Sequence, residues 1–398
     1  MNISFSPPDI GEEEINEVVD TLKSGWITTG PKTKRFEKEI ASFCGTSKAV
    51  CLISATAGLE LVLRLFGVGE GDEVITSAYT YTASASVINH VGAKIVLADT
   101  KKDSFEIDYD KLGSLINERT KAIIPMDFAG VICDYDSIFR VLDHKKTLFH
   151  PNTSMQERLG RVLVLGDAAH SFGAIKNNIM SGAHADFTVF SFHAVKSFTT
   201  AEGGAVTWTD SIAGYDEIYQ QFMLLSLHGQ TKDALSKIKT GAWEYDIVAP
   251  YYKYNMTDIT ASIGIAQMRR YAGIIKRRAE IVNMYDDLLG LDDFSILRHT
   301  GINFSSCKHL YVVRLNNKNE SFRNRVVEKM GEAGVATNVH FKPLPLLTAY
   351  RNLGFRIEDF PNAFSQYENC ISLPLYSLLT DDEVHYVTNT FKRVIKEK

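Results

Sequence analysis

The sequence has no run of about 18 apolar residues, and its start, MNISFSPPDIGEEE, lacks the charged-then-apolar pattern of a signal peptide. We therefore expect a cytoplasmic protein with no membrane partner. It also has no excess of basic residues, because 43 Lys and Arg stand against 48 Asp and Glu, for a formal net charge of −5. Nucleic-acid-binding domains usually carry a basic excess, so we expect no nucleic-acid partner.

Cysteine is scarce and scattered along the chain. The five cysteines are odd in number and never stand in CxxC spacing, which indicates neither a disulfide framework nor a zinc site. We interpret them as reduced and mostly structural, and we expect no metal centre. Internal repeats and low-complexity tracts are also missing, and the content of 45% hydrophobic and 23% charged residues is that of an ordinary globular protein.

The chain is long enough for two domains, because 398 residues exceed one ordinary core. From residue 48, short Val- and Ile-rich runs alternate with helical periods, which is typical of β-α units in a largely parallel sheet. Beyond about residue 265 the pattern changes to a long charged helix, a strand at 309–315, a helix at 321–335 and a closing helix. We predict an α/β fold with a large domain over residues 1–262 and a smaller α/β domain over residues 263–398.

Seven runs in the large domain are predicted to be strands. They are residues 49–53, 73–78, 94–100, 121–128, 161–167, 186–192 and 204–209. Helices are predicted between the first two runs, ending at Gly67, and over residues 82–92, whereas 144–160 has weak periodicity and is predicted to be a surface insertion. Ligands of such sheets bind at the carboxyl ends of the strands, so the polar residues that follow each strand are the candidates for a site.

Two of the polar clusters stand about twenty residues apart, GDAAHSFGA (166–174) and SFHAVKSFTTAEGGAV (191–206). Taken alone, Asp167 at a strand end is more often a helix cap or a turn former than a catalyst. The second cluster changes this interpretation, because it brings Lys196 into a turn rich in Thr and Gly with few acidic neighbours. A partly desolvated lysine has a lowered pKa and can attack carbonyl groups.

These residues fit pyridoxal phosphate (PLP), which needs an amine for a Schiff base, a carboxylate at the pyridine nitrogen, an aromatic face and a phosphate cradle. Lys196 offers the amine and Asp167 the carboxylate, and Tyr81 can stack on the ring. SATAG (54–58) opens a helix after a strand, so its amides suit a phosphate, to which Ser191 can add a hydroxyl. Taken singly, SATAG is equally well a helix start of small residues, and a residue such as Tyr81 is somewhat more often part of the core.

The order and spacing of these motifs resemble the DegT/DnrJ/EryC1/StrS family of sugar aminotransferases, which are fold-type I PLP enzymes of the aspartate aminotransferase type. The resemblance covers nearly the whole chain. It also runs through residues 24–45, YKYNMTDITASIGIAQM (252–268), HFKPLP (340–345) and ISLPLY (371–376). The segments FSFHAVK and YKYNMTD are most similar to the branch that forms 4-amino-4-deoxyarabinose on a nucleotide carrier.

The resemblance implies a role for each matching position. Lys196 would be the Schiff-base lysine and the proton shuttle, and Asp167 the partner of the ring nitrogen. The other cofactor contacts would be Thr56 and Ala57 in the phosphate-binding turn, Tyr81 on the ring, Ser191 at the phosphate, His170 near a cofactor oxygen, and Asn255 at the phosphate of the other subunit. Asn255 thereby implies a homodimer with shared sites. His340 in HFKPLP is expected at the substrate.

Asp127 departs from the family pattern, because the family usually has a histidine at this position. Since Asp127 follows a strand, we expect it to contribute to the floor of the substrate pocket, although a loop-capping aspartate is an equally good interpretation. The longer 144–160 segment is a second departure. Either departure would alter the pocket that binds the sugar, compared with other members of the family.

The predicted enzyme takes an amino group from glutamate, passes through pyridoxamine phosphate (PMP) and aminates a nucleotide-linked 4-keto sugar, for surface polysaccharide or related amino-sugar biosynthesis. One alternative is a related sugar dehydratase, in which histidine replaces the lysine. Another is a PLP-fold sensor without catalysis. The presence of Lys196 argues against the dehydratase. The presence of both Lys196 and Asp167 argues against a sensor without catalysis. A nicotinamide enzyme is poorly supported, because the glycine-rich GVGEGD (67–72) precedes a strand instead of following one.

Overall fold

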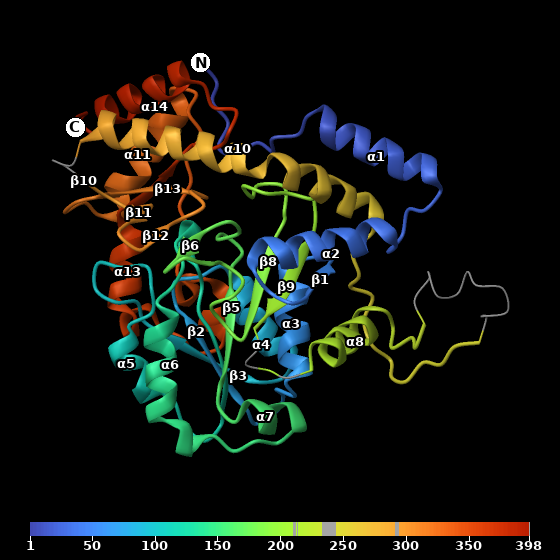
Figure 1. The fold of residues 1–398 in the computed structure, drawn as a ribbon. Helices are drawn as coiled ribbons and strands as arrows, with labels where there is room; N and C mark the ends of the chain where they lie inside the picture. Colours follow the sequence, from blue (N-terminus) through green and yellow to red (C-terminus); the bar gives the residue numbers. More distant parts are fainter. Residues whose placement is uncertain (210–211, 213, 233–243, 291–293, 398) are drawn as a thin grey trace.

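The computed structural model describes residues 1–209, 212, 214–232, 244–290 and 294–397. A seven-stranded sheet forms its centre, in the order β1-β9-β8-β5-β4-β2-β3 (Figure 1). The strands are β1 (Ala49–Leu52), β2 (Glu73–Ser77), β3 (Lys94–Ala98), β4 (Thr120–Ile124), β5 (Leu163–Asp167), β8 (Phe187–Ser191) and β9 (Gly204–Trp208). From β3 to β8 the neighbours are parallel, and β9 is antiparallel to both β8 and β1. The predicted mainly parallel α/β fold is confirmed.

Helices cover the sheet because its strands are apolar on both faces. Every residue of β1, β2, β4, β5 and β9 is buried. The helices that contact the strands are α2 (Pro31–Cys44), α3 (Ala55–Leu65), α4 (Thr82–His90), α5 (Tyr109–Leu115) and α8 (Tyr215–Ser226), and the same part of the chain also contains α6 (Tyr135–His144) and α7 (Ser154–Leu159). The helices predicted after the first two strands are therefore present as α3 and α4.

The segment predicted as a surface insertion contains the 3-10 turn Lys146–Leu148 and α7. Thr153 caps α7, since its side chain accepts a hydrogen bond from the Gln156 amide. The Gln156 side chain in turn donates to the Phe66 carbonyl at 2.9 Å. The segment is thus fastened to the end of α3.

A second, three-stranded antiparallel sheet has the order β10-β13-β14 and its own apolar core. Its elements are β10 (Phe294–Ile296), β13 (Tyr311–Leu315), α11 (Glu320–Glu332), β14 (Cys370–Leu373) and α14 (Asp381–Val394). The long helix α10 (Asp258–Leu289) packs against α1 (Glu12–Ser24), α2 and α14, and so runs along both parts of the molecule (Figure 1). The predicted boundary between residues 262 and 263 falls in the first turns of α10, and the division into two domains stays a prediction.

The other elements of the described chain are short. They are β6 (Ile175–Lys176), β7 (Ile179–Met180), β11 (Thr300–Gly301), β12 (Phe304–Ser305), α12 (Thr348–Asn352), α13 (Pro361–Glu368) and the 3-10 turns Phe128–Gly130, Leu344–Leu346 and Ile357–Asp359. β12 pairs with β6, which joins the segment before β13 to the loop after β5. Within the described ranges, no helix is both long enough and apolar enough to span a bilayer.

Candidate active site

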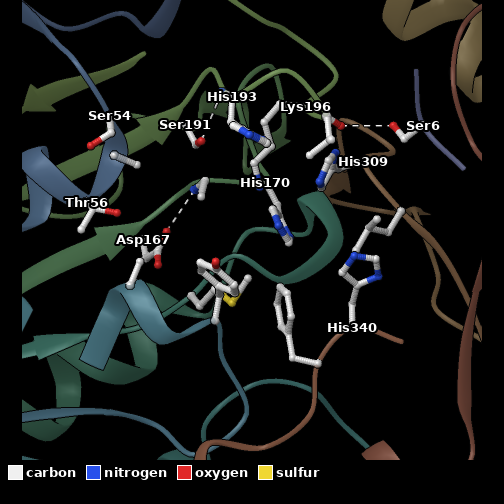
Figure 2. A pocket seen from close by; sticks show the side chains of 18 of the residues that line it. Ser6, Ser54, Thr56, Asp167, His170, Ser191, His193, Lys196, His309 and His340 are labelled. Atoms are coloured by element: carbon white, nitrogen blue, oxygen red, sulfur yellow. Dashed lines mark hydrogen bonds between the residues drawn. The ribbon is translucent and has the colours of Figure 1, made fainter. Parts of the chain in front are cut away.

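A cavity of about 360 Å³ lies beside the carboxyl ends of β5 and β8 and the first turn of α3 (Figure 2). This volume is within the usual range for small-molecule sites, and the position is the expected one for a parallel sheet. Seven of the residues singled out in the sequence line it: Thr56, Tyr81, Asp167, His170, Ser191, Lys196 and His340. The strand ends therefore gather side chains that are up to 284 residues apart in the chain, from Thr56 to His340.

Lys196 lies in the turn that follows β8, where its amide donates to the His193 carbonyl at 2.9 Å. Burial lowers the pKa of Lys196 to about 8, and the Asp167 carboxylate and the Cys307 thiol oppose this shift only in part. No carboxylate in the described part of the chain lies within ion-pair distance of the amine. Roughly a tenth of Lys196 is therefore neutral at pH 7, far more than for an ordinary lysine, and the neutral amine is the nucleophilic form.

Asp167 is the last residue of β5, and its side chain is only 3% exposed. The Ser84 hydroxyl donates to its carboxylate at 2.5 Å and the Ala169 amide at 3.2 Å. Burial raises the pKa of Asp167, against the opposing effects of Ser84, Ala169 and Lys196. A buried carboxylate is costly without a cationic partner, so the protonated ring nitrogen of PLP fits this position.

The first turn of α3 forms an anion cradle beside the cavity. Ser54 caps the helix and accepts a hydrogen bond from the Ala57 amide at 3.1 Å, while Thr56 lines the cavity. β9 comes very close here, since a Cβ on Gly204 would lie 2.5 Å from the Ala55 nitrogen. Ser191, at the end of β8, lines the same cavity. A helix N-terminus with adjacent hydroxyl groups suits the phosphate of the cofactor.

His170 is buried and electrically neutral, because burial lowers its pKa well below the usual value. The Ala129 amide donates to its Nδ1 at 3.3 Å, which places the ring proton on Nε2. Ala129 can aim its amide in this way because it adopts a left-handed backbone, with φ 54°. His340 is neutral as well: burial lowers its pKa to about 4, and its Nδ1 is 2.9 Å from the Ser372 hydroxyl.

Tyr81 precedes α4, and 59% of its surface is exposed. It is therefore not a core residue, which removes the alternative that the sequence left open. Its ring centroid lies 5.9 Å from that of Phe341. An exposed ring at the edge of the cavity is free to cover a flat ligand.

Two of the predicted cofactor contacts, Ala57 and Asn255, do not line the cavity in this protomer. The Ala57 amide is occupied by the Ser54 cap, and its side chain is buried. The Asn255 side chain donates to the Thr29 hydroxyl at 2.5 Å and accepts from the Lys253 amine. The cofactor contacts predicted for Ala57 and Asn255 therefore stay predictions.

Asp127 also lies outside the cavity lining and is buried in a network of its own. Its carboxylate accepts hydrogen bonds from the Ser171 hydroxyl at 2.6 Å, the Cys133 amide at 2.9 Å and the Tyr135 hydroxyl at 3.1 Å. Burial raises the pKa of Asp127 to about 6. The Asp127 amide donates to the Asp167 carbonyl at 3.0 Å. This geometry fits the second of the two interpretations of Asp127 given above, an aspartate that caps its own loop, better than a place on the floor of the substrate pocket.

Sequence reasoning missed three residues of the cavity wall, Phe5, Ser6 and His309. His309 is buried, burial lowers its pKa well below the usual value, and its Nδ1 has no hydrogen-bond partner among the described residues. Its ring centroid is 4.3 Å from that of His170. None of the three follows a strand of the large sheet, so the search for polar residues at strand ends could not find them.

Known proteins resemble this chain along its full length. A family model described as the DegT/DnrJ/EryC1/StrS aminotransferase family matches residues 8–392. An uncharacterized protein of Methanocaldococcus jannaschii is 41% identical, over 99% of this chain and 98% of its own. The spore coat polysaccharide biosynthesis protein SpsC of Bacillus subtilis is 36% identical, over 99% of this chain and 97% of its own.

Solved structures share the fold closely. The PMP form of a putative sugar aminotransferase from Streptococcus pneumoniae is 52% identical, with a TM-score of 0.97 and coverage of 99% of both chains. The PLP form of the same protein is 50% identical, with a TM-score of 0.96 over 100% of this chain and 99% of its own.

Proposed function

Because this chain belongs to the DegT/DnrJ/EryC1/StrS aminotransferase family, whose sugar aminotransferases depend on PLP, we propose that it moves an amino group from glutamate to a nucleotide-linked 4-keto sugar. The resemblance seen in the sequence and the PLP cofactor are confirmed. The donor and the form of the sugar are proposals. The observation that supports amino transfer is the cavity that Lys196, with its lowered pKa, and the buried Asp167 line together; no lysine, arginine or histidine in the described chain lies within ion-pair distance of Asp167.

The chain's own residues hold and tune the cofactor in this proposal. Thr56, Ser191 and the free amides of the α3 N-terminus would hold the phosphate. Asp167 keeps the ring nitrogen protonated, and the His170 Nε2 proton is available to a ring oxygen. When bound, the cofactor supplies an electron sink that stabilises negative charge on the carbon next to the transferred nitrogen.

Lys196 has two tasks. Its neutral amine is the group that would bind the aldehyde of the cofactor, and it would be released when the donor amine takes its place. The freed Nζ then takes a proton from one reacting carbon and returns it to the other, which a base with a pKa near the working pH does efficiently. Lysine at this position, where the dehydratase alternative has histidine, favours amino transfer over loss of water.

We also propose a homodimer in which Asn255 completes the phosphate site of the other subunit. Support comes from the exposed side chain of Ile53, which lies close to both features: Ile53 is 49% exposed, precedes Ser54 and donates its amide to the Tyr254 carbonyl at 2.8 Å. Ile53 thus joins the start of α3, at the proposed phosphate site, to the strand-like segment that carries Asn255.

The proposed function is tested by incubating the protein with ¹⁵N-glutamate and a panel of dTDP- and UDP-linked 4-keto sugars. We expect one sugar to gain an amino group that carries the label, as measured by mass spectrometry. The Lys196→Ala variant should form no product and lack the visible absorbance of the bound cofactor. Unlabelled aminated product would refute glutamate as donor, and a panel left unchanged would refute the acceptor class.

A further inference from the structure

The N-terminal segment, residues 3–9, runs from the turn after α11 past the cavity, and contacts hold it at both ends. The Ile3 amide donates to the Gly334 carbonyl at 2.8 Å, and the Ala336 amide donates to the Ile3 carbonyl at 3.0 Å. At the other end, the Asp9 carboxylate accepts from the Ser377 hydroxyl at 2.5 Å and pairs with Arg270. The position of the intervening residues is therefore set by contacts with three separate parts of the chain.

Phe5 and Ser6 lie between these anchors and line the cavity. The Ser6 hydroxyl donates to the carbonyl of Val195, the residue before Lys196, at 3.1 Å (Figure 2). The Phe5 ring stacks on His340, with centroids 5.5 Å apart and planes 25° apart. Phe5 remains partly exposed, so it presents apolar surface to the cavity.

We propose that Phe5 determines acceptor specificity by packing its ring against the apolar C–H face of the sugar. This role rests on the proposed function and assigns a part of the site to one of its two substrates. Phe341 and Tyr81 line the same cavity, and their rings contact each other. Phe5 therefore adds a third aromatic side chain to the lining, which we call the aromatic wall.

The chemistry of the wall distinguishes the two substrates. The face of an aromatic ring carries partial negative charge and binds apolar or cationic groups. Glutamate brings two carboxylates, which gain nothing from such a face, and its amino group must lose its proton to react at the cofactor, so it offers the wall no cation at that stage. A pyranose ring presents C–H groups that pack well on it. The acceptor half-reaction should therefore depend on Phe5, whereas the donor half-reaction should not.

A competing explanation is that the segment only holds the Lys196 turn through Ser6. Three variants separate the explanations: Phe5→Ala, Phe5→Tyr, and Ser4→Ala as a matched control at an exposed neighbour that does not line the cavity. Each half-reaction is followed separately through the cofactor absorbance. We expect Phe5→Ala to raise the KM for the best acceptor of the panel by about three- to tenfold. The donor half-reaction should change less than about twofold, and Phe5→Tyr and Ser4→Ala should behave like the wild type.

Binding provides a second readout that does not depend on turnover. Calorimetry measures the affinity of dTDP-4-keto-6-deoxyglucose and its UDP counterpart for PMP-loaded Lys196→Ala, with and without Phe5→Ala. Weaker sugar binding in the double variant supports the proposal. Equal binding, or equal losses in both half-reactions, overturns the role of Phe5. Wild-type protein that reacts with glutamate but aminates no sugar overturns the proposed function instead.

Discussion

Burial lowers the pKa of Lys196 from 10.5 to about 8, and this makes the pH dependence of the acceptor half-reaction predictable. The lysine must be neutral to accept a proton, and it is neutral above pH 8. We therefore expect the single-turnover rate of the PMP form to rise nearly tenfold per pH unit below pH 8 and to level off above it. A midpoint near the ordinary lysine value, or a flat profile, would show that another group moves the proton.

Asp167→Asn should keep the cofactor bound but lose most activity. The amide can still accept from Ser84 and Ala169, yet it cannot hold the ring nitrogen protonated. Removing one partner of a buried charge pair costs about 2–5 kcal/mol, so kcat should fall by roughly 30- to 5000-fold. Cofactor content and kcat are measured on the same preparation, with Asp134→Asn as a control outside the cavity. Unchanged kinetics would assign the role to a different acid.

The sequence could indicate Lys196, Asp167 and Ser191 because each stands at or just after a strand end, and parallel strands bring these ends to one edge. The rule that sites form at strand ends could not distinguish the role of Asp127 from that of Asp167. Both follow buried strands, and only the tertiary contacts show that Asp127 is satisfied by Ser171, Cys133 and Tyr135. Phe5 has no local signal at all, since its place depends on anchors at Arg270, Gly334 and Ser377, the nearest of which is 265 residues away in the chain.

At the level of elements, the seven strands of the main sheet were predictable because burial on both faces leaves continuous apolar runs. The long helix α10 begins at Asp258, eleven residues before the predicted charged helix at 269–290. Its first turns are buried against α2, so they lack the charged face on which that prediction depended. The two-residue strands β6, β7, β11 and β12 are too short to show any periodicity.

The close approach of β9 to α3 predicts that Gly204→Ala will weaken cofactor binding. The new Cβ would lie 2.5 Å from the Ala55 nitrogen and 2.6 Å from the Ser54 carbonyl carbon, so the first turn of α3 must shift. We expect at least a tenfold rise in the Kd of PLP, measured by absorbance titration of the apoprotein, because a shift of this turn displaces the phosphate donors.

Gly273→Ala in α10 is the matched control, since a Cβ there meets nothing within 4 Å. It should leave the Kd unchanged and stabilise the helix by about 0.5–1 kcal/mol. Similar PLP affinity in the Gly204→Ala variant and the wild type would contradict the role given to the α3 N-terminus.

Asp127 links the ends of β4 and β5, so its loss should act on the cofactor site through the fold. Asp127→Ala leaves the Cys133 amide and two hydroxyls without their acceptor, which should lower the free energy of unfolding by about 1–3 kcal/mol. Denaturant titration measures this change. We expect a weaker or shifted cofactor absorbance, whereas a loss confined to one half-reaction with an intact spectrum would place Asp127 at a substrate.

At the level of the whole molecule, the proposed homodimer makes each active site depend on two chains. Lys196 lines the cavity of its own protomer, whereas Asn255 lies outside that cavity and bonds to Thr29. If Asn255 serves the other subunit, Lys196→Ala and Asn255→Ala variants must complement each other. In a hybrid dimer one site carries both defects and the other carries neither.

Mixing the two inactive variants under conditions of subunit exchange should therefore restore activity. With random exchange half of the dimers are hybrids with one intact site, so activity should reach roughly a quarter of the wild-type value at equal total protein. Exchange is followed independently by mass spectrometry of differently tagged chains, and each variant incubated alone is the control. Proven exchange without recovery would place Asn255 in the site of its own subunit, where its bonds to Thr29 and Lys253 would have to break for it to reach the phosphate.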